Sequence, residues 1–278
     1  MNRRYEHVTL LTDLGDEGAG LLHAVLADRA PHARITDLSH SVPPYDVRAG
    51  SLALARAVHY LPDGVVIAAV DSAGSRPSIA IEVAGGNGVL LGPDNGLLAP
   101  AVALAGGAER AVIISGTVVA PSPGSLHIAR DVLAPAAAHL CSGGSFDDLG
   151  QVVDATMLLP GIVPIAREEN GALVAEVVWV DRFGNAQLNV GVEDLDGWPT
   201  AVRLTWGGDN VRSSTRADSF ADLGPGIHLV LDSYGMFAIA VARHTASEEL
   251  GLFVGTEVRL SPGDVGTSSP VTLRRKLQ

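Results

Sequence analysis

The chain of 278 residues has one cysteine, Cys141, and only 18% charged residues. A single cysteine cannot form an internal disulfide, so we expect a reducing, cytoplasmic setting. Its Ala-rich surroundings favour a small buried side chain over a nucleophile. The apolar runs are short and interrupted by Gly, Pro and charge, so we expect no membrane partner. A strand rather than a long apolar core follows Met1–Tyr5, so we also expect no signal peptide.

A basic surface and the common cofactor motifs are also missing. The formal net charge is −12, which argues against a nucleic-acid partner because such proteins usually present a basic face. The nine histidines lack zinc-like spacing, with neither a His-Glu-x-x-His motif nor a Cys pair. Gly-x-Gly-x-x-Gly and Gly-x-x-x-x-Gly-Lys are absent as well. We therefore expect no metal and no cofactor, and nucleotide phosphates are poor ligand candidates.

The sequence does have many short apolar segments, and 47% of its residues are hydrophobic. In the first half, apolar strands alternate with helical segments, a pattern typical of a mostly parallel sheet covered by helices. The expected strands are His7–Thr12, Ala33–Leu38, Gly64–Val70, Ser78–Val83, Gly88–Leu91 and Ala111–Ile114. The expected helices are Ala19–Asp28, Val47–Tyr60, Leu97–Ala105 and Ile128–Leu140.

The pattern changes after Gly150, where a Pro-containing connection leads into mostly short strands. These strands are Ala172–Val180, Ala201–Trp206, Gly226–Leu231, Met236–Val241 and Glu257–Leu260. Short strands separated by Gly and Asp are typical of a small antiparallel barrel or sandwich. We therefore predict an α/β protein with an N-terminal domain over residues 1–160, a linker over 161–170 and a C-terminal antiparallel β-barrel domain over 171–278.

Two carboxylates end apolar strands in the first half. Asp13 follows the first strand, where ligands of open α/β sheets collect, and it could bind a ribose diol or simply cap a helix or turn. Asp71 ends Gly64–Val70 in the same way, and Arg76 follows a few residues later. An Asp–Arg pair would keep the acid ionised and either orient a water or staple the loop.

Three further polar residues of the first half are candidates for the same site. Asn95 lies in Pro93–Gly96, a turn signature that is often only structural. His127 precedes a helix and is a candidate base or partner of Asp71. His40 is a second candidate, although a histidine in a turn needs no function.

The second half has a polar run directly after the strand Ala172–Val180. Within it, Asp181, Phe183 and Asn185 offer an acid, an aromatic face and a carboxamide, which suit a nucleobase or an amino-acid head group. The alternative is a bulge followed by a turn. Ser233 and Tyr234 form a weaker candidate, because Tyr234 could either stack on a ligand or cap the edge of the barrel.

Taken in order, these clusters resemble the S-adenosyl-L-methionine (SAM) hydroxide adenosyltransferases, the wider family that includes the fluorinase and chlorinase. The resemblance extends from about Val8 to Pro262. It is carried by Thr12-Asp13-Leu14-Gly15 with Asp16, Asp37-Leu38-Ser39-His40, Val70-Asp71 through Arg76, Pro93-Asp94-Asn95-Gly96, Arg130-Asp131-Val132-Leu133-Ala134-Pro135, Asp181 with Phe183-Gly184-Asn185 and Asn189, and Ser233 with Gly235.

The resemblance implies a homotrimer in which SAM lies between the α/β domain of one subunit and the barrel of the next. It implies that water or hydroxide attacks C5′ of the ribose, releasing L-methionine and leaving adenosine. A sulfonium is already an activated leaving group, so this reaction needs neither a metal nor a general acid. By matching position, Asp71, Arg76 and His127 would orient the water, and the substrate would be held by Asp13, Asp16, Asn95, Asp181, Phe183, Asn185, Ser233, Tyr234 and Ala246.

The residue at position 71 favours hydrolysis over halogenation. The resemblance implies that halide-using members of the family have tyrosine at this position. The carboxylate of Asp71 would instead repel a halide anion. The loops Asp13–Asp16 and Asp71–Arg76 are each about two residues shorter than the family pattern, and one extra residue separates His127 from Arg130. These departures keep a catalytically silent SAM- or adenosine-binding protein as an alternative, with a SAM-dependent halogenase less favoured.

Overall fold

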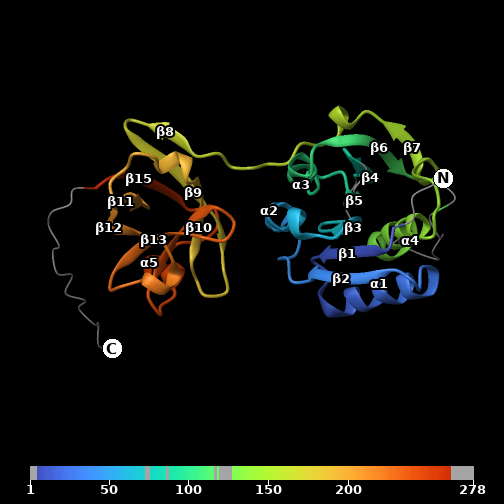
Figure 1. Ribbon diagram of the computed structural model, residues 1–278, viewed down its shortest axis with the longest axis horizontal. Helices are drawn as coiled ribbons and strands as arrows, with labels where there is room; N and C mark the ends of the chain where they lie inside the picture. The colour runs from blue at the N-terminus through green and yellow to red at the C-terminus, as the bar shows by residue number, and fades with distance from the viewer. Residues whose placement is uncertain (1–4, 73–75, 86–87, 116–117, 119–126, 264–278) are drawn as a thin grey trace. The chain divides into compact units, whose positions relative to one another are not determined.

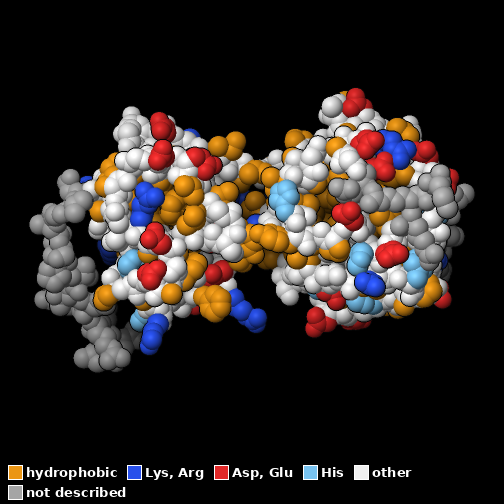
Figure 2. Space-filling model, in the orientation of Figure 1, with side chains coloured by type: hydrophobic (Ala, Val, Ile, Leu, Met, Phe, Trp, Pro, Cys, Tyr) orange, Lys and Arg blue, Asp and Glu red, His pale blue; other side chains and the backbone are white. Residues whose placement is uncertain are grey.

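The computed structural model describes residues 5–72, 76–85, 88–115, 118 and 127–263. The chain folds as two compact units, Met1–Val163 and Pro164–Gln278 (Figure 1). Within the described ranges, no helix is long and apolar enough to cross a membrane. On the face drawn in Figure 2, acidic and basic side chains are scattered over both units.

The N-terminal unit contains a seven-stranded sheet in the order β2-β1-β3-β5-β4-β6-β7. Strands β2, β1, β3 and β5 pair in parallel, whereas β4 pairs antiparallel with both β5 and β6, and β7 pairs antiparallel with β6. All but β4 and β7 of these strands therefore point the same way, which confirms the mostly parallel sheet. The strands are β1 (His7–Thr12), β2 (Arg34–Ser39), β3 (Gly64–Ala69), β4 (Ser78–Val83), β5 (Gly88–Pro93), β6 (Ala108–Ile114) and β7 (Gly150–Val153).

Helices cover both faces of this sheet (Figure 1). Successive residues of a strand point to opposite faces, so Leu10 of β1 packs with Leu22 of the first helix, while the next residue, Leu11, packs with Leu54 of the second. Burial on both faces explains why the central strands β1, β3 and β5 are largely apolar, whereas the residues of the edge strands β2 and β7 are exposed or half-buried. The helices of this unit are α1 (Gly15–Arg29), α2 (Val47–Ala57), α3 (Ala99–Leu104) and α4 (Ala134–Cys141).

The helix expected over Ile128–Leu140 is interrupted near its start. Ala129–Leu133 forms a π-helical turn, and α4 continues from Ala134. Pro135 lies in the first turn of α4, where its missing N–H needs no partner. Wide turns of this kind occur often at functional sites, and this one holds Arg130 and Asp131.

The C-terminal unit is built on an eight-stranded sheet in the order β10-β14-β13-β12-β11-β15-β9-β8. Pairing of β10 with β9 closes the sheet into a barrel and leaves β8 outside. The pairs are antiparallel except β12 with β13, so the predicted antiparallel barrel is confirmed with one parallel pair. The strands are β8 (Arg167–Glu169), β9 (Ala172–Val180), β10 (Ala186–Gly191), β11 (Ala201–Trp206), β12 (Asn210–Ala217), β13 (Ile227–Leu231), β14 (Met236–Val241) and β15 (Glu257–Pro262), with helix α5 at Ala246–Leu250.

Two barrel strands, β10 and β12, are absent from the sequence prediction. Strand β12 is mostly exposed and polar, so it lacks the alternation of apolar residues that marks a strand. Strand β10 carries polar residues that are satisfied inside the fold: the Oδ1 atom of Asn189 accepts the N–H of Glu176 at 2.6 Å. Gln187, on the same strand, is also buried. Each of the two strands pairs with the strand before it through a short turn and with a second strand further along the chain, and this pairing is not visible in the pattern of its own side chains.

Candidate functional site

Asp13 stands at the carboxyl end of β1 and organises the edge of the N-terminal sheet. Its Oδ2 atom accepts the backbone N–H groups of Tyr45, at 3.0 Å, and of Asp71, at 3.1 Å. Both donors have left-handed backbones, with φ of 65° at Tyr45 and 50° at Asp71. A non-glycine residue in this region carries a strain of about 1–3 kcal/mol, which the surroundings must hold in place. The Asp13 carboxylate supplies that restraint for both residues.

The ends of strands β3 and β5 are joined at the same edge. The side-chain amide of Asn95 donates to the carbonyl of Val70 at 3.1 Å, and its oxygen accepts the N–H of Leu97 at 3.2 Å. Val70 directly precedes Asp71, so Asp13, Asp71 and Asn95 are brought to one edge of the sheet. This is where neighbouring parallel strands end and where α/β proteins bind ligands.

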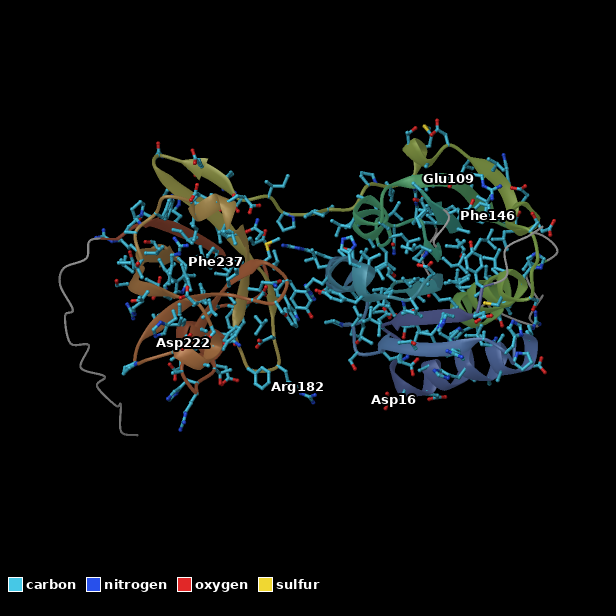
Figure 3. All side chains as sticks on the ribbon, viewed as in Figure 1. Asp16, Glu109, Phe146, Arg182, Asp222 and Phe237 are labelled. Atoms are coloured by element: carbon cyan, nitrogen blue, oxygen red, sulfur yellow. The ribbon has the colours of Figure 1, made fainter. Side chains whose placement is uncertain are left out.

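Asp16 lies close in sequence to this edge but makes a different kind of contribution. It is exposed in the first turn of α1, where an acid complements the helix dipole (Figure 3). Gly15 before it has a φ of 67°, and its N–H donates to the carbonyl of His40 at 3.1 Å. The loop from Thr12 to Asp16 is therefore tied to the segment after β2.

Arg76 departs from the sequence prediction. Within the described part of the chain its ion pair is with Asp94, with 2.5 Å between Nη2 and Oδ2, and its Nε–H donates to the Asp94 carbonyl at 2.9 Å. The predicted Asp71–Arg76 pair is therefore wrong. Asp94 is only 4% exposed, so its charge requires a cation, whereas Asp71 is half-buried and can be solvated.

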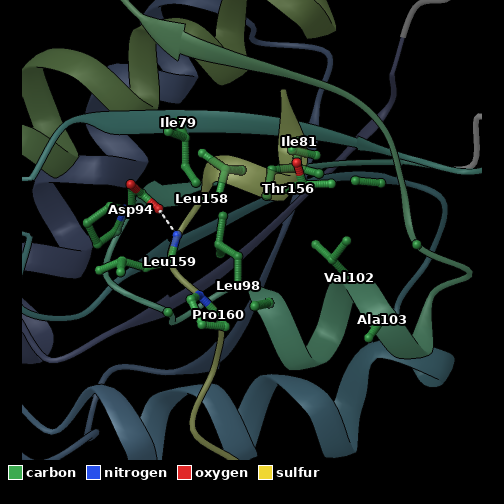
Figure 4. A pocket seen from close by; sticks show the side chains of 16 residues that line it. Ile79, Ile81, Asp94, Leu98, Val102, Ala103, Thr156, Leu158, Leu159 and Pro160 are labelled. Atoms are coloured by element: carbon green, nitrogen blue, oxygen red, sulfur yellow. Dashed lines mark hydrogen bonds between the residues drawn. The ribbon is translucent and has the colours of Figure 1, made fainter. Parts of the chain in front are cut away.

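Asp94 also anchors the segment that leaves the N-terminal sheet. Its Oδ1 atom accepts the N–H of Leu159 at 2.8 Å (Figure 4). Beside it lies a cavity of about 350 Å³, lined mainly by apolar side chains that include Ile79, Leu98 and Val102. At Gly96, whose φ is 89°, a Cβ atom would lie 2.9 Å from the Pro160 carbonyl oxygen. Asp94 and Gly96 are thus explained by packing of the chain itself.

His127 lies two residues before the π-helical turn, and among the described residues its hydrogen bonds are with that turn and not with Asp71. Its backbone N–H donates to Oδ2 of Asp131 at 2.9 Å, and its Nδ1 atom accepts the N–H of Arg130 at 3.2 Å. Arg130 binds Asp131 through two hydrogen bonds, of 2.6 and 2.8 Å. That guanidinium lowers the pKa of Asp131, against the effect of burial and with help from the His127 N–H. The contacts of the described residues give His127 a capping role, with Nδ1 as acceptor and Nε2 available.

In the C-terminal unit, the predicted residues gather around one cavity. A cavity of about 470 Å³ is lined by Asp181, Phe183, Asn185, Ser233 and Tyr234, together with residues of neighbouring strands. Its volume is within the range typical of small-molecule sites. Two sequence segments about fifty residues apart therefore meet, as a common binding site requires.

Ala246 is the exception among the predicted binding residues of this unit. It is fully buried in the first turn of α5 and is not among the residues that line the cavity. The next residue, Ser247, donates its N–H to the carbonyl of Gly184 at 2.9 Å. The prediction that adenine lies near Ala246 stays a prediction; its buried side chain does not line this cavity, and the hydrogen bond from Ser247 supports the turn at Gly184.

The turn from Asp181 to Asn185 is held by its own first residue. Oδ1 of Asp181 accepts the N–H groups of Phe183, at 2.8 Å, and Asn185, at 2.9 Å, and Oδ2 accepts the Asn185 side-chain amide at 2.8 Å. Gly184, with a φ of 81°, makes the turn possible. The result is an aromatic ring, Phe183, that is 78% exposed beside the cavity.

The structure adds residues to this cavity that the sequence had not indicated. Trp179 packs edge-on against Tyr234, with ring centroids 6.1 Å apart. Asp232 accepts the N–H groups of Tyr234 at 2.8 Å and Met236 at 3.1 Å, and it also accepts a short hydrogen bond from the Gln187 side chain. Asp218 joins Asp181 and Asp232 in the lining. The signal that could have found Asp232 is its place directly before Ser233 at the end of a buried strand.

Three carboxylates with several aromatic rings favour a ligand that carries both a cationic group and flat apolar parts. The N-terminal unit carries acidic side chains at the edge of its sheet. The chain is therefore a two-domain protein, with an α/β domain and a β-barrel domain, whose polar clusters suit a small polar molecule. The chain belongs to the SAM hydroxide adenosyltransferase family. The N-terminal domain of that family matches residues 8–150, and its C-terminal domain matches residues 175–259. The predicted family resemblance is confirmed.

Individual relatives match along almost the whole chain. The (R)-S-adenosyl-L-methionine hydrolase of Salinispora tropica is 38% identical over 261 residues, covering 92% of this chain and 98% of the relative. A fluorinase of Actinoplanes is more distant, at 23% identity over 275 residues, which cover 86% of this chain and 91% of the fluorinase. The crystal structure of an uncharacterized conserved protein from Thermotoga maritima superimposes with a TM-score of 0.82 at 28% identity, covering 91% of this chain and 99% of that structure.

Proposed function

We propose that this chain hydrolyses S-adenosyl-L-methionine to adenosine and L-methionine by in-line attack of water or hydroxide on C5′ of the ribose. The observation that carries the proposal is the 38% identity, through both domains, to a protein named (R)-S-adenosyl-L-methionine hydrolase. The residue Asp71 supports hydrolysis over halogen transfer, because a carboxylate repels a halide and can accept a proton from water.

The N-terminal sheet edge suits the reacting half of the substrate. Oδ2 of Asp13 is occupied by two backbone N–H groups, which leaves Oδ1 to accept hydrogen bonds from the ribose hydroxyls. Asp71, held at the end of β3 by the same carboxylate, would orient the attacking water. Because the C5′–S bond breaks to release methionine as a neutral thioether, no protonation of the leaving group is needed, and positioning and exclusion of competing water supply the catalysis. Asn95, Asp16 and His127 complete the proposed N-terminal set.

Arg76 keeps an indirect place in this proposal. Its guanidinium is 45% exposed and is bound to buried Asp94, so it would fix the loop after Asp71 rather than contact the water. Asp94 lies next to Asn95 and thus at the edge where Asp71 stands. An Arg76 substitution would then weaken catalysis by moving Asp71.

The barrel cavity suits the methionine part and the base. The carboxylates of Asp181, Asp218 and Asp232 would attract the methionine ammonium, and Asn185 and Ser233 would bind its carboxylate. The rings of Phe183 and Tyr234 offer faces for adenine stacking. We propose that the two halves of the site meet between subunits of a homotrimer, which light scattering would test by a solution mass three times that of the 28.6 kDa chain. Buried Cys141, the chain's one cysteine, supports a cytoplasmic setting.

The test uses the two sulfonium epimers of SAM separately, because the Salinispora relative is named for the (R) form. Adenosine and methionine are measured by chromatography for the wild type, for Asp71→Asn and for the control Asp28→Asn, which changes an exposed acid on α1. We expect adenosine formation to fall about 10²-fold or more in Asp71→Asn, as for loss of a proton acceptor, and to stay unchanged in the control.

Other outcomes of this test point to the alternatives. Absence of adenosine from both epimers, with binding visible by calorimetry, would establish a silent binding protein. Formation of a 5′-halo-adenosine in the presence of chloride or fluoride would establish a halogenase. Wild-type turnover by Asp71→Asn would remove Asp71 from the mechanism.

A further inference from the structure

A second polar cluster lies on the N-terminal unit, apart from the residues assigned to substrate. It joins His23 on α1, Asp37 on β2 and His40, which directly follows β2. The Nε2 atom of His23 lies 2.8 and 3.1 Å from the two Asp37 carboxylate oxygens, and Nε2 of His40 lies 3.0 Å from Oδ1. One potential ligand atom from each residue falls within 4.8 Å of the others.

His40 is the member that ordinary surface hydrogen bonding does not explain. Its side chain is only 10% exposed, and Nδ1 is engaged by the Thr12 hydroxyl at 2.9 Å. Its Nε2 atom is buried and, among the described residues, has no hydrogen-bond partner of proper geometry, although it is aimed at the Asp37 carboxylate. A buried polar atom of this kind requires a further partner.

We propose that His23, Asp37 and His40 form a binding site for a divalent transition-metal ion of the zinc type. Two imidazoles and one carboxylate are a donor set that zinc accepts, with bonds of about 2.0–2.2 Å. Ligand atoms around a tetrahedral ion of that size lie about 3.3 Å apart, as those bond lengths require. The two His–Asp separations are 2.8 and 3.0 Å, and the two histidine nitrogens lie within 4.8 Å of each other, so small shifts of the side chains would bring all three into this geometry.

The surroundings of the three ligands fit this assignment. The Thr12 hydroxyl can accept the proton of Nδ1 of His40, which directs the lone pair of Nε2 toward the ion, the usual arrangement of a metal-bound histidine. His23 and Asp37 are 40% and 44% exposed, so an ion can enter from solvent and keep water in the remaining position. The sequence could not show the site, because its ligands come from a helix and a neighbouring strand.

The position of the site indicates a structural role. The ion would link α1 to the end of β2. Through the hydrogen bond between His40 and Thr12, it would also restrain the loop that begins at Asp13. The carbonyl of His40 also accepts the N–H of Gly15, in the same loop. Bound metal would therefore fix the sheet edge that carries Asp13, while taking no part in the release of methionine from C5′.

The test measures metal binding directly and without substrate, so its result is independent of the proposed hydrolysis. The full chain, free of any histidine tag, is treated with a chelator, dialysed and titrated with Zn²⁺ by calorimetry, and Co²⁺ is used to record the absorption of the bound ion. We expect one ion per chain and a rise of Tm with Zn²⁺, because an ion that binds only the folded chain stabilises it.

Variants assign the ion to these side chains. We expect His23→Asn and Asp37→Asn to weaken Zn²⁺ at least about tenfold, the smallest loss typical even for a group that only supports a ligand. His23 is exposed enough that its loss leaves the fold intact, which circular dichroism checks. The matched control is His139→Asn, which removes a histidine paired at 3.2 Å with one carboxylate, Asp148. Absence of stoichiometric binding, or equal binding by wild type and His23→Asn, would overturn the assignment.

Discussion

The double contact of Asp13 predicts that its substitutions separate structural from substrate-binding effects. Asp13→Ala removes the acceptor of two backbone N–H groups, those of Tyr45 and Asp71. An unsatisfied buried N–H costs about 1–3 kcal/mol. Tyr45 is exposed and its N–H can turn to water, whereas Asp71 is half-buried. We therefore expect a total loss of about 2–3 kcal/mol in the free energy of unfolding, below the upper limit for two fully buried groups.

Asp13→Asn is the matched variant, because its amide oxygen can still accept both N–H groups but carries no charge. We expect a loss of about 1 kcal/mol, the difference between a charged and a neutral acceptor. Both variants should reduce hydrolysis, since the ribose hydroxyls lose the carboxylate. In Asp13→Asn, a tenfold rise in KM would correspond to about 1.4 kcal/mol of binding.

Calorimetry is the suitable assay, because the chain has two compact units and each can unfold separately. For a unit of this size, a loss of about 2–3 kcal/mol in the free energy of unfolding lowers the midpoint of thermal unfolding by about 4–12 °C. The N-terminal transition should move in the order wild type, Asp13→Asn, Asp13→Ala, and the C-terminal transition should stay in place. Equal midpoints for wild type and Asp13→Ala would refute the restraint argued for Asp13.

Three further predictions concern the other elements. Gly184→Ala should destabilise the barrel unit by several kcal/mol, since φ is 81° and the new Cβ would lie 2.0 Å from Cγ2 of Thr245. Phe183→Ala should leave unfolding unchanged to within about 0.5 kcal/mol, because the ring is 78% exposed, yet raise KM if it stacks on substrate. Asp131→Asn should lower Tm at neutral pH, and its difference from wild type should shrink as the pH falls below 3.8, because Arg130 holds the folded-state pKa of Asp131 beneath that ordinary value.

Each of these has a plain contradicting result. A wild-type free energy of unfolding for Gly184→Ala, measured with denaturant, would show that the segment at Thr245 moves aside at little cost. An unchanged KM for Phe183→Ala would make its ring a surface feature only. For Asp131, a constant gap in Tm between pH 7 and pH 3 would mean that its ionisation does not contribute to stability.

The sequence by itself determined most of the N-terminal fold. Strands such as His7–Thr12 and Gly64–Ala69 are apolar on both faces, and that pattern is local, so it can be read without the structure. It also placed Asp13 and Asp71 at strand ends, where parallel neighbours bring them to one edge. In the barrel, the order of Asp181, Phe183 and Asn185 was enough to predict a common cluster, and the structure places all three at one cavity.

Only the tertiary structure shows which side chains form ion pairs and which strands pair with one another. Arg76 binds Asp94 instead of Asp71, because burial of Asp94 makes its need for a cation greater. The polar strand Asn210–Ala217 exists because its neighbours pair with it, and a pattern of side chains does not encode that. His23 meets His40 across a helix and a strand. Contacts between residues that are distant in sequence depend on how the helices and strands pack. The local sequence pattern predicts the elements but not their packing.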